Sequence, residues 1–188
     1  MAKPGATGPV GPFPDRVDDS EEARLEYDRL RRRVLWKITT GLYIVGSTDR
    51  DLRWNLMTLN WITQVSFDPK WVGISIERDA YTHDLIETSR VFSVCFVDRE
   101  DRAIVRKFTK PVEVDLAAHT LNGFAFHTRA TGAPLLNQSV AFLDCEVRHA
   151  FEVGNHTLFI GEVVDCDFLK DEETPLLRME DTRMNNGG

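Results

Sequence analysis

The clearest strand pattern of the chain lies in "VAFLDCEVRHAFEVGNHTLFIGEVVDCDFL", residues 140–169. Apolar and charged side chains alternate from Leu143 to Arg148, which is the pattern of a strand with one face in the core and one in water. Asp144 falls on the predicted wet face. A Gly-Asn pair at 154–155 joins this run to a second apolar run, and glycine in the first position suits a type II′ turn. The stretch therefore predicts a long antiparallel hairpin.

Shorter strand patterns precede this hairpin along the chain. The first two of these segments, 41–47 and 54–61, are joined by a polar connection and predict an antiparallel pair of strands. Two short helical segments are expected at 80–89, with Asp79 as the cap, and at 100–108, whereas the region 110–132 is less regular. Antiparallel strands with only short helices between them predict a closed or partly closed β-barrel rather than a parallel sheet. The strand segments are "GLYIVGS" (41–47), "WNLMTLNW" (54–61), "FDPKWVGISIE" (67–77) and "VFSVCFV" (91–97).

The N-terminal part predicts one helix outside this barrel. Asp19 and Glu22 have the spacing of a capping box. Tyr27, Leu30 and Val34 then lie on one helical stripe among charged residues, so an amphipathic helix is expected to pack on the domain or on a partner subunit.

The expected domain organisation has four parts. Residues 1–18 are rich in glycine and proline and predict a disordered tail, and residues 19–38 form the N-terminal helix. Residues 39–170 form the barrel domain, and residues 171–188 form a C-terminal tail.

Composition narrows the class of protein. The chain has 188 residues, of which 42% are hydrophobic, so it fits one domain with a substantial core. Its formal net charge of -7 argues against a nucleic acid or an anionic membrane as a partner. No apolar run approaches the roughly 20 residues that cross a bilayer, and no signal peptide is recognisable, so the cytoplasm is the expected location.

The cysteines and histidines indicate no metal site. Cys95, Cys145 and Cys166 are far apart, lack a CxxC spacing and have apolar neighbours, which favours buried hydrophobic residues. The five histidines lack ligand spacing as well, and a scattered histidine is most often a surface or core residue. His156 is the candidate exception, because it follows the hairpin turn at the predicted mouth of the barrel.

One internal segment, "TLNWITQVSFDP" (58–69), mixes polar side chains with apolar ones that are suited to burial. This segment, together with "GLYIVGS", "YTHDLIETSRVFSVCFV" and "LDCEVRHAFEVGNHTLFIGEVVDC", resembles the flavin reductase family in order and spacing over residues 40–168. The resemblance implies a mainly β fold, an antiparallel FMN-binding split barrel. It also implies reduction of FMN, or alternatively FAD, by NADH or NADPH in a homodimer that supplies reduced flavin to a monooxygenase.

The resemblance implies a set of site residues. His156 lies where the nicotinamide approaches the flavin, a positioning task that makes it the candidate catalytic residue. Positions 81, 82 and 107 match the phosphate end of the site, for which a plain helix turn and a solvated lysine are the alternatives. The implied flavin-binding residues are Met57, Thr58, Leu59, Asn60, Val65, Ser66, Phe67, Tyr81, Thr82, Cys95, Lys107 and Phe108.

Two departures from the family pattern keep other functions open. Cys95 stands where many members carry asparagine, and Trp61 is bulkier than the residues usual at its position. A non-catalytic FMN-binding electron carrier or redox sensor on the same fold is therefore the alternative to a reductase. An empty barrel that serves as an interaction module is the third hypothesis.

Overall fold

The computed structural model describes residues 11–49, 51 and 53–182, and the chain forms two units. The first unit comprises residues 1–39 with 185–188, and its helix α1 spans Glu21–Leu35. Ser20 caps this helix, because its hydroxyl accepts a hydrogen bond from the Ala23 amide at 3.3 Å. The predicted capping box at Asp19 is therefore wrong by one residue. The residues 1–10 of the predicted disordered tail lie outside the described residues.

The described part of this first unit has its own small aromatic cluster. The rings of Phe13 and Tyr27 meet edge to face with centroids 6.2 Å apart, and the guanidinium groups of Arg24 and Arg31 lie 5.3 and 5.2 Å from the Phe13 ring centroid. Phe13 thus packs on the helix, although the sequence placed it in a tail with little to bury. No residue of α1 is buried: Tyr27 of the apolar stripe is half-buried, and Leu30 and Val34 are exposed in the single chain.

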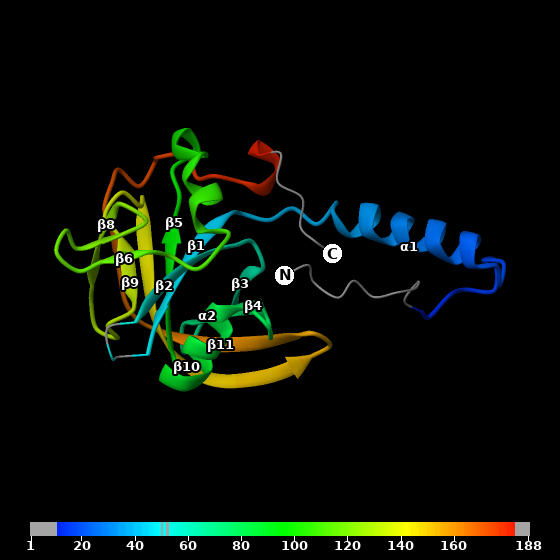
Figure 1. Cartoon of the computed structure of the whole chain (residues 1–188), viewed down its shortest axis with the longest axis horizontal. Helices are drawn as coiled ribbons and strands as arrows, with labels where there is room; N and C mark the ends of the chain where they lie inside the picture. The colour runs from blue at the N-terminus through cyan, green and yellow to red at the C-terminus, as the bar shows by residue number, and fades with distance from the viewer. Residues whose placement is uncertain (1–10, 50, 52, 183–188) are drawn as a thin grey trace. The chain divides into compact units, whose positions relative to one another are not determined.

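The second unit, residues 40–184, is built on a seven-stranded antiparallel sheet. Its strand order is β2-β1-β5-β10-β11-β4-β3. The edge strands β2 and β3 are consecutive in the chain and are separated only by Asn60 and Trp61. Two residues can join opposite edges only if the sheet curls until its edges meet, which confirms the split barrel (Figure 1). The strands are β1 (Tyr43–Thr48), β2 (Trp54–Leu59), β3 (Ile62–Ser66), β4 (Trp71–Glu77), β5 (Val91–Phe96), β10 (Ala141–Val153) and β11 (His156–Phe168).

A second, four-stranded sheet occupies the region that the sequence left irregular. Its strands are too short to show an alternation of apolar and polar residues in the sequence. They are β6 (Val114–Asp115), β7 (Thr120–Leu121), β8 (Phe124–Thr128) and β9 (Pro134–Leu136).

The helices of this unit are short. Helix α2 spans Tyr81–Ser89, but its N-cap is Ala80, which makes no side-chain cap bond, so the predicted cap at Asp79 is wrong. The helix expected at 100–108 forms two 3-10 turns, η1 (Arg99–Asp101) and η2 (Ile104–Phe108). A further 3-10 turn, η3, spans Met179–Asp181.

The core lies on both faces of the large sheet. Ile44 and Cys95 point into one hydrophobic cluster, while their neighbours Val45 and Val94 point into the other. Each large side chain that is buried in this way contributes roughly 1.5–3 kcal/mol. Leu177 is buried in the first cluster, so the segment expected to be a tail from residue 171 packs on the domain as far as η3.

The long hairpin that defined the fold is confirmed, with one correction. β10 pairs with β11 along its whole length, and Gly154 adopts a positive φ of 59° at the turn. Asp144 is buried, however, because the face predicted to be wet is covered as well: Phe142, two residues before it on the same face, lies in the first core cluster. Its carboxylate accepts hydrogen bonds from the main chain and hydroxyl of Thr131, and burial raises its pKa. The hairpin tip, in yellow and orange in Figure 1, extends beyond the rest of the sheet.

Within the described residues, no helix has the length and apolarity that a membrane span requires.

Candidate functional site

The two-residue link between β2 and β3 is held firmly by hydrogen bonds. Asn60 is buried, and its side-chain amide donates to the hydroxyl of Thr40 at 3.2 Å. The Asn60 carbonyl accepts from the Ile62 amide at 3.0 Å, and the Trp61 carbonyl accepts from the Ser75 amide at 3.1 Å. The backbone is therefore fixed on both sides of Trp61, whose ring is nevertheless 42% exposed.

The Trp61 ring lies against His156. The ring centroids are 4.8 Å apart and the planes are inclined at 46°. His156 is the first residue of β11, and its Nδ1 lies 2.8 Å from the Asn155 side-chain oxygen. The structure thus brings the predicted catalytic residue next to a tryptophan that the sequence marked only as unusually bulky. No sequence signal could pair two residues so far apart along the chain.

The loop from β3 to β4 presents apolar surface. Phe67 is 82% exposed and Val65 is also exposed, while Ser66 is half-buried. None of the residues in β3 is buried, so the polar side chains of this segment face solvent at a sheet edge rather than the core. The burial that the sequence suggested for the apolar residues of the segment holds in part for Leu59 and Ile62, which pack against the Val45 core cluster. It is wrong for Trp61, Val65 and Phe67, which are exposed, and β3 pairs with β4 alone and has one open edge.

The polar side chains of β2 are used to join it to α2 and η2. The Asn55 amide donates to the Thr82 hydroxyl at 2.7 Å and its oxygen accepts from the Val112 amide at 3.0 Å. The Thr58 hydroxyl donates to the carbonyl of Val105 in η2. Thr58 and Thr82 therefore bond within the domain, and Thr82 is buried. Sequence reasoning missed Asn55, whose position inside a strand gives no hint of this bridging role.

The remaining β2 positions and the phosphate-end positions differ in exposure. Met57 and Leu59 are partly buried against the second core cluster, the one that contains Val45. Tyr81 and Lys107 are exposed, at the start of α2 and within η2 respectively. Contact between β2 and both of these elements brings this part of the predicted set to one region of the domain.

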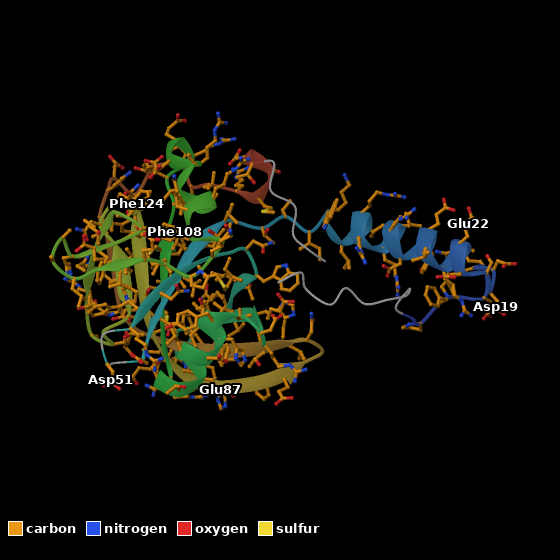
Figure 2. All side chains as sticks on the ribbon, viewed as in Figure 1. Asp19, Glu22, Asp51, Glu87, Phe108 and Phe124 are labelled. Carbon is orange, nitrogen blue, oxygen red and sulfur yellow. The ribbon has the colours of Figure 1, made fainter. Side chains whose placement is uncertain are left out.

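Cys95 and Phe108 are placed differently from the rest of the predicted set. Both are fully buried, so neither offers surface to a ligand in this structure. The Cys95 sulfur accepts a hydrogen bond from the Leu136 amide at 3.4 Å, and burial raises the pKa of its thiol to about 11. The Phe108 ring packs on Phe124 with centroids 5.5 Å apart (Figure 2).

An open cavity of about 470 Å³ lies beside η1 and η2. It is lined by Arg102, Ala103, Arg106, Asp181 and Thr182. Both arginines are exposed, while Asp181 pairs with Arg99 at 2.5 Å. Among the described lining residues, the two arginines are therefore the groups that could meet an anion. The facing wall comes from the C-terminal segment, through Asp181 and Thr182, and no local sequence pattern could indicate that contact.

Comparison with known proteins supplies the family. The model of the "Flavin reductase like domain" matches residues 35–187. A ferric-chelate reductase (NAD(P)H) from Archaeoglobus fulgidus is 32% identical over 144 residues, which are 74% of this chain and 82% of that protein. An NADH-dependent FAD reductase from Streptomyces globisporus is 30% identical over 167 residues, 82% of this chain and 81% of that protein.

A solved structure agrees with this match. The styrene monooxygenase flavin reductase from Pseudomonas putida S12 superposes with a TM-score of 0.65 at 26% identity, and the match covers 79% of this chain and 90% of that one. With a family model that matches most of its length and a relative above 30% identity, this chain belongs to the flavin reductase-like domain family.

Proposed function

We propose that this protein is a flavin reductase that transfers hydride from NADH or NADPH to FMN or FAD. The observation that carries the proposal is the family match over residues 35–187. Support comes from the similar proteins described above, which are named as NAD(P)H-dependent or NADH-dependent reductases.

The residues around the β2–β3 link fit a flavin. An isoalloxazine ring has apolar faces and a polar edge, so its site needs exposed aromatic or apolar surface beside hydrogen-bonding groups. Trp61 and Phe67 provide the first, and the main chain around Ser66 provides the second. When bound, the flavin supplies the hydride acceptor.

The protein's own residues would position the two reactants. The Asn60 and Trp61 hydrogen bonds hold the link rigid, which favours a fixed distance between donor and acceptor. His156 would orient the nicotinamide, since hydride transfer itself requires no proton from this side chain. Tyr81 and Lys107 would hold the phosphate end, because both are exposed whereas Thr82 is buried.

The direct test is an absorption spectrum of the purified protein after addition of FMN or FAD, followed by anaerobic NADH and, separately, NADPH. A flavin band that bleaches at a rate proportional to enzyme concentration supports the reductase. A bound flavin that neither nucleotide bleaches would instead support the electron carrier or redox sensor. Absence of flavin binding would overturn both and leave an interaction module.

We further propose that the protein is a homodimer and that its reduced flavin serves a monooxygenase. The dimer is supported by exposed large apolar side chains within the 40–184 unit, among them Phe67, Phe151 and Val153. The monooxygenase is supported by the printed name of the Pseudomonas putida relative. Light scattering after gel filtration tests the dimer, and a mass of one chain, 21.5 kDa, would overturn it.

A further inference from the structure

Helix α2 carries a buried histidine with one unused ring nitrogen. The side chain of His83 is 6% exposed, and its ring packs on Phe159 with centroids 5.3 Å apart. Its Nε2 lies 2.8 Å from the hydroxyl of Thr157 in β11. Its Nδ1 is buried and has no hydrogen-bond partner among the described residues. Burial of a polar nitrogen without a partner costs free energy, so this atom requires an explanation.

Two carboxylates face the unused nitrogen. The Asp84 Oδ1 lies 3.5 Å from His83 Nδ1, and the Glu87 Oε2 lies 3.9 Å from it. All three atoms lie within 4.8 Å of one another. His83 and Glu87 are four residues apart on α2, so the helix itself places both side chains on one face. Glu87 lies at the periphery of the domain (Figure 2).

We propose that His83 Nδ1, Asp84 and Glu87 bind one divalent transition-metal ion. Ligands about 2.1 Å from a tetrahedral zinc ion are roughly 3.4 Å apart, and the two observed distances are close to this value. Asp84 and Glu87 are 75% and 67% exposed, so an ion can reach the site from solvent and water can complete its coordination.

The partner of the other ring nitrogen supports this assignment. Metal-binding histidines usually donate their second ring N–H to an oxygen, which fixes the tautomer and the ring orientation. Thr157 is the acceptor that Nε2–H requires when Nδ1 binds the ion. Thr157 is also buried, so its hydroxyl holds the imidazole in one orientation.

The donor set selects the class of ion. One imidazole nitrogen with two carboxylate oxygens suits zinc and similar first-row ions, whereas calcium and magnesium prefer oxygen ligands alone. The three cysteines are not part of the cluster. Zinc is therefore the probe, with magnesium as the contrast.

The experiment is a calorimetric titration of zinc into the full-length protein, made without flavin in a Cys166→Ser background. This background removes the one exposed thiol, which could bind zinc by itself. We expect one zinc ion per chain and no heat of binding with magnesium. Glu87→Gln and Asp84→Asn should each weaken zinc binding by about tenfold or more, and Thr157→Val should weaken it by roughly 10- to 100-fold.

Asp79→Asn is the matched control. Asp79 is an exposed carboxylate close to the start of α2 and is not part of the cluster. Its substitution by asparagine therefore removes the same charge as Asp84→Asn without removing a ligand. Its zinc affinity should stay within about threefold of the parent, because it keeps all three ligands and loses only an exposed charge that solvent and salt screen. Both carboxylates of the site are exposed as well, so their variants are expected to fold normally.

A second readout identifies the nitrogen. In a long-range proton–nitrogen spectrum of the histidine side chains, zinc should shift the Nδ1 signal of His83 and leave its Nε2 protonated. Failure to bind zinc, or binding that neither Glu87→Gln nor Asp84→Asn weakens, would overturn the proposal. Neither readout involves flavin or nicotinamide, so the outcome is independent of the proposed reductase activity.

Discussion

Trp61 and His156 form an aromatic pair with ring centroids 4.8 Å apart, contributed by the β2–β3 link and by the first residue of β11. The pair brings together Trp61, one of the two positions at which this chain departs from the family pattern, and His156, the position implied to meet the nicotinamide. A substitution of either Trp61 or His156 therefore alters the surface that the other ring presents to a ligand.

His156→Ala should therefore slow reduction more than it weakens flavin binding. We expect the rate of NADH-dependent flavin reduction to fall by about tenfold, the scale of a lost positioning contact. The dissociation constant of the flavin should change by less than about twofold, which corresponds to about 0.4 kcal/mol. Stopped-flow reduction and fluorescence titration measure the two quantities. His149→Ala is the control, because His149 lies on the same hairpin but contacts Trp71 instead. Equal effects from both substitutions would remove His156 from the site.

Thr58→Val should destabilise the domain. Its hydroxyl donates to the Val105 carbonyl, so the substitution removes one internal hydrogen bond and should lower the free energy of unfolding by about 0.5–1.5 kcal/mol. Urea denaturation measures this change. Thr63→Val in the exposed strand β3 is the control, since the Thr63 hydroxyl bonds only to the adjacent Gln64 carbonyl. A Thr58 variant as stable as the control would contradict the anchoring role.

Only one of the three cysteines should react quickly with a thiol reagent in the native protein. Burial raises the pKa of Cys95 to about 11 and also raises the pKa of Cys145, so neither forms appreciable thiolate at pH 8. Cys166 is exposed. An absorbance assay with a disulfide reagent should count one rapid thiol natively and three in denaturant. More than one rapid thiol would show that the core opens.

The ion pair between Asp98 and Lys170 should give stability that depends on pH. The Lys170 ammonium, 2.8 Å away, and the Glu100 amide lower the pKa of Asp98 below its ordinary value. A depressed pKa means that the stabilisation is present above the unfolded-state value of 3.8 and is lost as the pH falls through the folded-state value.

The test is Lys170→Met, which removes the partner. The variant should be less stable than the parent at pH 7 by up to about 1 kcal/mol, the usual limit for a surface pair. This difference should shrink as the pH falls below the unfolded-state value, because the parent then loses the same interaction. Urea titrations at pH 7 and at a pH below 3.8 measure this difference, because urea carries no charge and does not screen the pair. A difference that does not change with pH would contradict the assignment.

The hairpin tip offers a test of the proposed dimer. Phe151 is exposed near the end of β10, so Phe151→Glu should leave the domain folded. If the tip lies in the dimer interface, the buried charge should shift the gel-filtration mass toward that of one chain. Asn155→Asp, which adds one charge at the adjacent turn, is the control. A Phe151 variant that stays dimeric would exclude this part of the surface.

The sequence predicted the barrel strands well because most of them are long enough to show a period. β10 and β11 each span 13 residues. The predicted burial is wrong there at Asp144, a buried carboxylate that accepts a hydrogen bond from Thr131, and at Cys166, which the sequence predicts to be buried and which is exposed. The strands β6 and β7 have two residues each, too few for any pattern.

The candidate site was less accessible to sequence reasoning. The residues of the site could be inferred from the family resemblance. The direction in which each side chain points depends on which strands pair across the fold, and the sequence does not show this. Cys95 and its neighbour Val94 point into opposite core clusters, so a shift of one residue decides which layer receives each side chain. Thr82 is buried because Asn55 from another strand reaches it, and local spacing carries no information on that contact.

The two-residue link between β2 and β3 also limits how the barrel can move. Asn60 and Trp61 span opposite edges of one sheet, and their carbonyls are bonded to Ile62 and Ser75. The two edges of the sheet therefore cannot part at this end by more than a two-residue link can span. Because the Ser75 bond ties Trp61 to β4, and β4 pairs with the strand that begins at His156, the aromatic pair travels as one unit with that edge of the sheet.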